Sequence, residues 1–160
     1  NREKKRDPEM HQTRKGQQWY FGMKIHIGVD SQSGLAHSAV VTAANVHDKH
    51  PLPDLLHGSE RRVYGDSAYA SQKALIQAKA AQARDFTNQR VRRGGEIDEA
   101  ERSRNRNKSK VRARVEHVFA VVKRLWGFNK VRYRGLAKNA TRSFVALGLA
   151  NIYLALRNLA

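Results

Sequence analysis

The first strong pattern along the chain is an alternation of apolar and polar positions between residues 19 and 29. The apolar members are Trp19, Phe21, Met23, Ile25, Ile27 and Val29. A period of two residues is typical of a β-strand, because successive side chains of a strand point to opposite faces. A turn-forming cluster at 30–34 follows, and an apolar run resumes over 35–43. The pattern therefore predicts a long antiparallel hairpin.

The rest of the chain predicts shorter elements. We expect helices over 49–57, 72–83, 109–126 and 137–158, and short strands over 62–65 and 85–88. Asp48 and Ser71 precede the first two helices, and residues of these types accept hydrogen bonds from the free N–H groups of a helix start. Strands interspersed with helices in this order indicate a mixed α/β fold.

Two segments show no apolar periodicity. Residues 1–17 are polar and charged, which predicts an irregular N-terminal arm. Residues 90–110 combine two glycines with four acids and many Arg and Asn residues, which predicts a basic loop, or a helix ordered only by its ligand. A chain of 160 residues suits one domain, so we assign residues 18–160 to a single folded unit.

The charge of the chain points to a polyanionic partner. Lys and Arg total 31 against 14 Asp and Glu, a formal charge of +17, which favours nucleic acid or an anionic membrane surface. Seven cations occupy every even position from 102 to 114: Arg102, Arg104, Arg106, Lys108, Lys110, Arg112 and Arg114. A solvated loop is the alternative reading, but we expect phosphate contacts, which give salt-dependent affinity with little base recognition. Trp19, Tyr20 and Trp126 are candidates for base stacking, but we favour core or hairpin packing for them.

Several classes of function are excluded. The chain has no cysteine, so disulfides, thiolate metal sites and cysteine nucleophiles are absent. No apolar run is long enough to span a membrane and no secretory signal precedes the arm, so we expect a cytoplasmic protein without a membrane partner. Neither standard glycine-rich phosphate loop occurs, so nucleotide hydrolysis is not indicated.

Two acidic residues are the candidates for chemistry. Asp66 ends the 62–65 strand just before a helix, where α/β sheets place their ligand sites. Glu116 lies with Arg112 and Lys123 on one stripe of its predicted helix, at the border of the core face. A turn-forming Asp and an ordinary i,i+4 ion pair are the plainer explanations. Together, however, two carboxylates can hold Mg²⁺ or Mn²⁺, and paired ions support phosphodiester chemistry.

The spacing Arg112-x3-Glu116-x6-Lys123 resembles the Y-x2-R-x3-E-x6-K signature of DDE-type bacterial insertion-sequence transposases. Further segments look like the same family and come in its order, closest to its insertion-sequence-five branch; they are residues 6–16, 19–24, 28–30, 43–48 and the strand ending at Asp66. The resemblance implies an RNase H-like domain with a mixed sheet flanked by helices. Asp66 would be its second catalytic acid and Glu116 its last.

The resemblance also implies a reaction and partners. The reaction is metal-dependent cleavage at the ends of a transposon, followed by attack of the freed 3′-hydroxyl on target DNA. The partners are DNA and further copies of the protein, on the bacterial nucleoid. Arg112 and Lys123 would hold phosphates beside Glu116. From the two acids we expect carboxylates within about 4–8 Å of each other, close enough to share ions.

The chain departs from the family pattern at two points. Ser109 stands at the position of the signature Tyr. The family's first catalytic Asp lies on a strand before residues 6–11, so we expect the sheet to lack its first strand and the chain alone to be inactive. Asp30 is a poor substitute because it begins a turn, and Asp7 is a weaker one. The alternatives are a catalytically incomplete DNA-binding remnant and a non-enzymatic basic RNA-binding protein.

Overall fold

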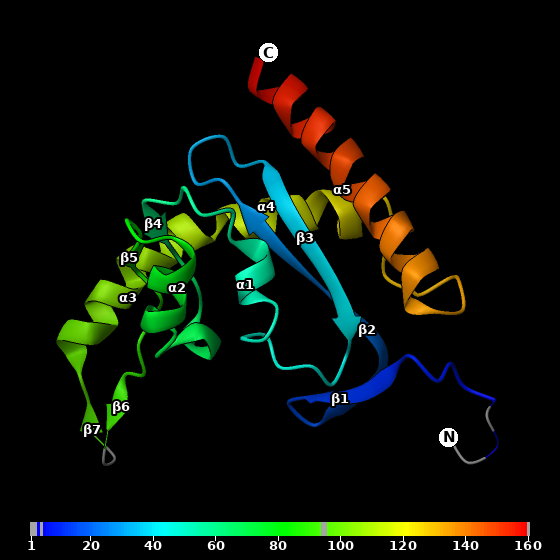
Figure 1. The fold of residues 1–160 in the computed structure, drawn as a ribbon, viewed down its shortest axis with the longest axis horizontal. Helices are drawn as coiled ribbons and strands as arrows, with labels where there is room; N and C mark the ends of the chain where they lie inside the picture. Colours follow the sequence, from blue (N-terminus) through cyan, green and yellow to red (C-terminus); the bar gives the residue numbers. More distant parts are fainter. Residues whose placement is uncertain (1–2, 4, 94–95, 160) are drawn as a thin grey trace.

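A three-stranded antiparallel sheet forms the middle of the computed structural model, which describes residues 3, 5–93 and 96–159 (Figure 1). Its strands are β1 (His11–Lys15), β2 (Gln18–Val29) and β3 (Ala36–Ala43), in the order β1-β2-β3. β3 pairs with β2 from Met23 to Val29, while β1 pairs with the first five residues of β2. The predicted hairpin over 19–43 is therefore confirmed.

β1 corrects the expectation of an irregular arm over residues 1–17. Its side chains are mostly exposed, so no apolar alternation marks it in the sequence. The backbone ladder with β2 stabilises it instead, and the connecting turn contains Gly16 at φ 61°, a conformation that favours glycine. A strand held in this way cannot be recognised from hydrophobic periodicity.

The middle of the chain builds a separate small unit. Its elements are α1 (Leu52–Leu55), β4 (Arg62–Val63), a 3₁₀ turn (Ser67–Tyr69), α2 (Lys73–Lys79) and β5 (Arg84–Asp85). β4 and β5 pair in parallel. The apolar side chains of the unit form a first core of Leu52, Val63, Ile76, Ala80 and Ala83. The expected helices and strands exist here, but each is shorter than predicted.

Both predicted helix caps in this unit are wrong. Asp48 forms an ion pair with Lys24 at 3.0 Å instead, and α1 begins after Pro51. Ser71 has a left-handed backbone, φ 71°, and Gln72 precedes the first turn of α2. The ion pair of Asp48 and the left-handed backbone of Ser71 are incompatible with the capping roles that the local sequence predicted.

The C-terminal half is mainly helical. It contains β6 (Arg92–Arg93), β7 (Glu96–Ile97), α3 (Glu99–Arg112), α4 (Arg114–Ala120), a π-helix (Val121–Leu125) and α5 (Leu136–Leu159). The prediction over 137–158 is confirmed by α5. The single helix expected over 109–126 is divided between the end of α3, α4 and the π-helix.

The basic loop expected over residues 90–110 is wrong for most of its length, because α3 covers it. Asp98 caps this helix by accepting a hydrogen bond from the Glu101 N–H. Glu99 and Glu101 lie in the first turn and pair with Arg102 and Arg104 one turn later. Caps and ion pairs stabilise α3, so it forms without the apolar stripe that usually reveals a helix.

A second core joins the sheet to the C-terminal helices. It consists of Val118, Val121, Val122, Leu147 and Ala150, packed against the inner face of β2. Asn151 of α5 adds a polar anchor: its side-chain amide accepts from the Ala36 N–H at 2.8 Å and donates to the Ala36 carbonyl at 2.7 Å. α5 is thereby tied to the start of β3.

The N-terminal segment caps α5 from a distant part of the sequence. A carboxylate oxygen of Asp7 accepts from the Gly135 N–H, and one of Glu9 accepts from the Leu136 N–H at 2.6 Å. Two acids at a helix N-terminus satisfy free N–H groups and oppose the positive end of the helix dipole. The hydrogen bond from Gly135 is the largest cause that lowers the pKa of Asp7 below 3.8.

This cap makes stability depend on pH. Because the folded state lowers the pKa of Asp7, its stabilising contribution is present above pH 3.8 and is lost as pH falls through the lower folded value. Asp7→Asn should lower the thermal midpoint at pH 7, and the difference from wild type should vanish in strong acid. Thermal melts across this pH range test it; a difference that stays constant with pH would contradict it.

Candidate functional site

Asp66 lies three residues beyond the end of β4 (Arg62–Val63), because the strand is shorter than the sequence predicted. Its Oδ1 atom accepts a hydrogen bond from the Ala68 N–H at 2.8 Å and so caps the 3₁₀ turn. Among the described residues, its other oxygen accepts no hydrogen bond. Burial, and then the charges of Asp48 and Asp66, raise the pKa of Tyr69 to about 12. One Asp66 oxygen is therefore fixed by backbone while the second is available to a ligand.

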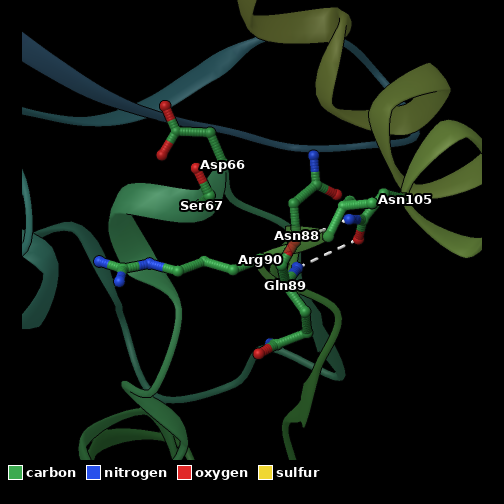
Figure 2. A pocket seen from close by; sticks show the side chains of 7 residues that line it. Asp66, Ser67, Asn88, Gln89, Arg90 and Asn105 are labelled. Atoms are coloured by element: carbon green, nitrogen blue, oxygen red, sulfur yellow. Dashed lines mark hydrogen bonds between the residues drawn. The ribbon is translucent and has the colours of Figure 1, made fainter. Parts of the chain in front are cut away.

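An open, polar pocket of about 460 Å³ lies beside Asp66 (Figure 2). The residues around it are Asp66, Ser67, Asn88, Gln89, Arg90, Val91 and Asn105. Asn88 donates its side-chain N–H to the Ser109 hydroxyl at 3.0 Å, and its Oδ1 atom is buried without a hydrogen-bond partner. A buried, unpaired carbonyl oxygen is costly and indicates a ligand position. Sequence reasoning missed Asn88, because nothing in its local sequence distinguishes it.

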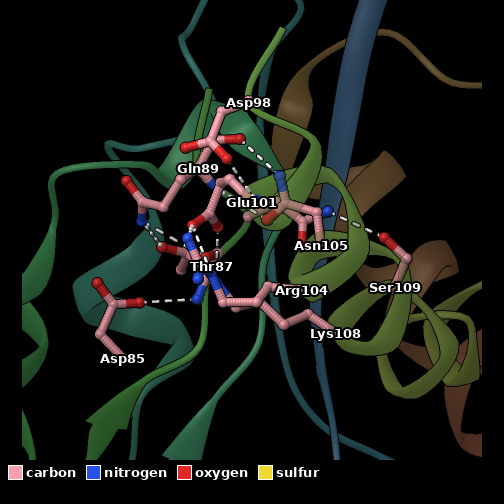
Figure 3. Close-up of polar contacts among 10 residues, drawn as sticks. Asp85, Thr87, Gln89, Asp98, Glu101, Arg104, Asn105, Lys108 and Ser109 are labelled. Atoms are coloured by element: carbon pink, nitrogen blue, oxygen red, sulfur yellow. Dashed lines mark hydrogen bonds and ion pairs between the residues drawn. The ribbon is translucent and has the colours of Figure 1, made fainter. Parts of the chain in front are cut away.

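α3 holds the far wall of this pocket in place (Figure 3). The Asn105 side chain, buried in the helix, accepts from the Gln89 N–H at 3.1 Å and donates to the Gln89 carbonyl at 2.8 Å. Lys108 donates to the Thr87 carbonyl at 3.1 Å and pairs with Glu101 at 3.4 Å. Lys108, predicted to contact DNA, thus serves an internal contact in this structure.

Glu101 is the centre of this internal network. Arg104 pairs with it at 2.8 Å and Lys108 from the other side. Burial acts to raise the pKa of Glu101, but the hydrogen bonds and charges of Arg104 and Lys108 outweigh it and the pKa is lowered. Two of the seven regularly spaced cations therefore share Glu101 as their carboxylate partner.

Four of the seven cations lie on α3 and the start of α4, on a different face from Arg104 and Lys108. Arg102, Arg106, Lys110 and Arg114 recur at every fourth residue, and all four are exposed. Arg102 pairs with Glu99 at the surface, whereas Arg106, Lys110 and Arg114 form no ion pair within the described part of the chain. We call these four residues the outer basic stripe. Its cations are exposed, as phosphate contacts require.

Glu116 lies on α4, with 62% of its side chain exposed. Arg112 pairs with it across one turn, at 3.2 Å, as the sequence predicted. Lys123 does not join them: it lies in the π-helix and its ammonium group sits over the Phe119 ring, 4.8 Å from the centroid. An extra residue in the helical turn changes the angular spacing on which the predicted three-residue stripe depended.

The two candidate acids belong to different halves of the molecule. Asp66 follows a strand of the first core, and Glu116 extends from a helix of the second. Among the described residues no hydrogen bond joins Asp66 to Glu116, and no cluster of three His, Asp or Glu side chains is placed to hold a metal. Their approach to within 4–8 Å remains a prediction.

The two substitute acids are used elsewhere. Asp30 accepts from both the N–H and the hydroxyl of Ser33 at 2.7 Å, and these bonds, the backbone one first, lower its pKa. Asp7 caps α5. Asp30 thus has the local turn role that the sequence suggested, whereas Asp7 has a structural role at a site far away in the sequence.

No helix within the described residues is long and apolar enough to cross a membrane. A comparison with protein families found one match over most of the chain: the family described as transposase DDE domain, at residues 2–152. No solved structure matches the chain significantly.

Proposed function

Because the chain belongs to the transposase DDE domain family, whose role is DNA transposition, we propose that it carries out metal-dependent phosphodiester cleavage and strand transfer at insertion-sequence ends. The observation that supports this most is the position of Asp66 at a strand end, beside a polar pocket with an unpaired Asn88 oxygen. Family membership does not favour an RNA-binding protein or a non-catalytic remnant. Strand-transfer assays on Asp66 and Glu116 variants, described in the Discussion, test the proposal.

An RNase H-like fold would join two sheets that are separate in the described structure, the antiparallel one that contains β2–β3 and the parallel pair β4–β5. Beyond β1, the edge of β2 opposite β3 pairs with no other strand in the described structure, from Met23 to Val29. The resemblance implies a further strand with the first catalytic acid, and this free edge offers it backbone hydrogen bonds.

The donor atoms near Asp66 fit a hard divalent cation. The Asp66 carboxylate is an oxygen ligand of the kind that Mg²⁺ and Mn²⁺ prefer, and the enclosed, unpaired Asn88 oxygen would join it only if its side chain turned toward the pocket. Glu116 would supply a further carboxylate once its ion pair with Arg112 loosens. A bound pair of ions would activate the attacking oxygen and stabilise the leaving one.

The protein's own residues would orient the DNA strand. Arg112 forms an ion pair with Glu116 and would offer its remaining N–H groups to a scissile phosphate. Lys123 lies over the Phe119 ring, apart from this pair, and its charge, free of any carboxylate in the described residues, would contact a further phosphate. Asp66, held by the Ala68 N–H, keeps a fixed direction with little loss of entropy on binding.

The outer basic stripe would contact the DNA backbone. Its cations stand about 6 Å apart along the helix axis, since four residues rise 1.5 Å each. The row winds around the helix by about 40° per step, and cations at this spacing can neutralise successive phosphates of a DNA strand that follows it. Arg104 and Lys108, which the sequence also predicted to bind DNA, lie outside this stripe. Both form ion pairs with Glu101 instead. A role on DNA would place the protein on the bacterial nucleoid.

We further propose that two copies of the chain associate through α5. Large side chains on its exposed face follow the 4-3-4-3 spacing of a coiled-coil seam: Val145, Leu149, Ile152, Leu156 and Leu159. With neighbouring Phe144 and Tyr153 they give α5 a long exposed apolar face, of the kind that marks an interaction site. No charged residue lies between Ser143 and Leu156, so the seam itself carries no repulsion.

Polar substitutions on this seam should separate the copies. Leu149→Gln together with Ile152→Gln should shift the chain from dimer to monomer in sedimentation or light scattering, because each removes an apolar side chain from the interface. Arg157→Gln, on the same helix but about 120° from Val145, is the matched control and should leave the dimer intact. A wild-type chain that is monomeric at about 50 μM would contradict the proposal.

A further inference from the structure

The outer half of the β1–β2 hairpin exposes three consecutive aromatic residues. Trp19, Tyr20 and Phe21 are 60%, 47% and 42% exposed. They precede the part of β2 that pairs with β3, so β1 is their only partner strand (Figure 1). The partner changes at Gly22, whose φ of 153° is rarely adopted by other residues. The hairpin thus extends beyond the sheet that anchors it.

This part of the hairpin has too little core to explain its aromatic residues. A two-stranded hairpin is at best marginally stable in water, and each large side chain on it is left in contact with solvent. The sequence favoured core or hairpin packing for Trp19. Because 60% of this residue is exposed, it lies outside any core. Contiguous exposed aromatic surface of this kind marks an interaction site.

Cations lie directly against these rings. The guanidinium of Arg14, the cross-strand partner of Trp19, lies 5.9 Å from the indole centroid. That of Arg6 lies 5.3 Å from the Phe21 centroid. Trp19 and Phe21 alternate along β2 and so share one face of the hairpin. This face therefore presents flat aromatic rings next to positive charge.

Every charged residue within β1 and β2 is a cation, while Asp7 lines the same pocket as Phe21 and Asp48 pairs with Lys24. No Asp or Glu occurs from Met10 to Val29, a stretch that contains Arg14, Lys15 and Lys24. Such a surface complements a polyanion rather than a second copy of this strongly basic chain. Aromatic rings with interspersed cations are the combination that binds single-stranded nucleic acid, where bases stack and phosphates pair with cations.

We propose that the β1–β2 hairpin binds single-stranded DNA, with bases stacking on Trp19 and Phe21 and phosphates pairing with Arg14 and Lys15. The proposal rests on DNA as the partner of the proposed function. It adds a binding surface outside the pocket at Asp66 and outside the outer basic stripe. Unpaired strands near a cleaved end are the DNA species that such a surface fits.

The test uses the full 160-residue chain. Trp126→Phe leaves Trp19 as the only tryptophan, so its fluorescence reports on stacking. Adding a single-stranded oligonucleotide of about 20 residues should quench this fluorescence, as base stacking does. Trp19→Ala should weaken binding to that strand roughly tenfold and to a blunt duplex less than twofold, while Trp19→Phe should retain most of the affinity.

The outcomes separate this proposal from the proposed function. Duplex binding with normal salt dependence, but with no quenching and no selective effect of Trp19→Ala, would overturn the hairpin proposal alone. An equal loss on both DNA forms would also overturn it, since it would indicate unfolding or general contact. A wild-type chain that binds no DNA at all would overturn both proposals. Tighter binding to single-stranded RNA than to DNA of the same sequence would overturn the choice of DNA as the ligand of the hairpin.

Discussion

Asp66→Asn and Glu116→Gln should each reduce DNA strand transfer at least about a thousandfold, which corresponds to about 4 kcal/mol of transition-state stabilisation. Either change removes a negative oxygen ligand while keeping the side-chain size. Asp66→Asn also keeps an oxygen that can accept from the Ala68 N–H, so folding should be little affected. Strand transfer is measured with Mg²⁺ or Mn²⁺ on the protein as its gene encodes it. DNA binding by the same variants is measured in parallel.

Two controls make this result specific to the proposed site. Glu99→Gln alters a surface ion pair on α3 and should leave strand transfer unchanged. Asp30→Asn weakens a turn that Ser33 stabilises and should retain most of the activity if the protein stays folded. Full activity of Asp66→Asn, or loss of activity with Asp30→Asn in a folded protein, would show that the acids have been assigned wrongly.

Neutralising the outer basic stripe should have the second-largest effect. With Arg102, Arg106, Lys110 and Arg114 all changed to Gln, the log–log salt dependence of duplex binding should become less steep by about 3 to 4, since each phosphate contact contributes about 0.9. Affinity at low salt should fall by more than a hundredfold. Binding isotherms at several salt concentrations measure both quantities.

Arg104→Gln with Lys108→Gln is the matched control for the stripe. It also removes two cations of α3, but these engage Glu101 and the Thr87 carbonyl. The salt dependence should therefore change little, while the thermal midpoint should fall because the pocket wall loses an anchor. If both sets flattened the salt dependence in proportion to their charge, the division of the cations into two faces would have no functional meaning.

The sequence predicted elements whose apolar residues reach a core. The alternation from Ile25 to Val29 and the apolar face of α5 both pack into the second core, and both elements were predicted well. β1 and α3 were missed because neither depends on an apolar face. Backbone pairing stabilises β1, and the Asp98 cap, ion pairs and the buried Asn105 amide stabilise α3. Such polar interactions have no periodicity to read.

The candidate site shows the same limit. The positions of Asp66 and Glu116 and the Arg112–Glu116 pair were predictable, because a strand end and an i,i+4 spacing are local features. The roles of Lys108 and Asn88 were not predictable. Lys108 contacts a carbonyl 21 residues away, and Asn88 is notable only because tertiary packing leaves its oxygen unpaired.

The cap of α5 by Asp7 and Glu9 bears on how the chain folds during synthesis. Asp7 and Gly135 are separated by 128 residues, so the N-terminal segment leaves the ribosome long before its partner exists. At about 5–20 residues per second, this interval lasts roughly 6 to 25 s. During this time Asp7 and Glu9 have no helix end to bind. The contact also has a very high sequence separation, which favours slow folding, and it closes only when nearly the whole chain has been translated.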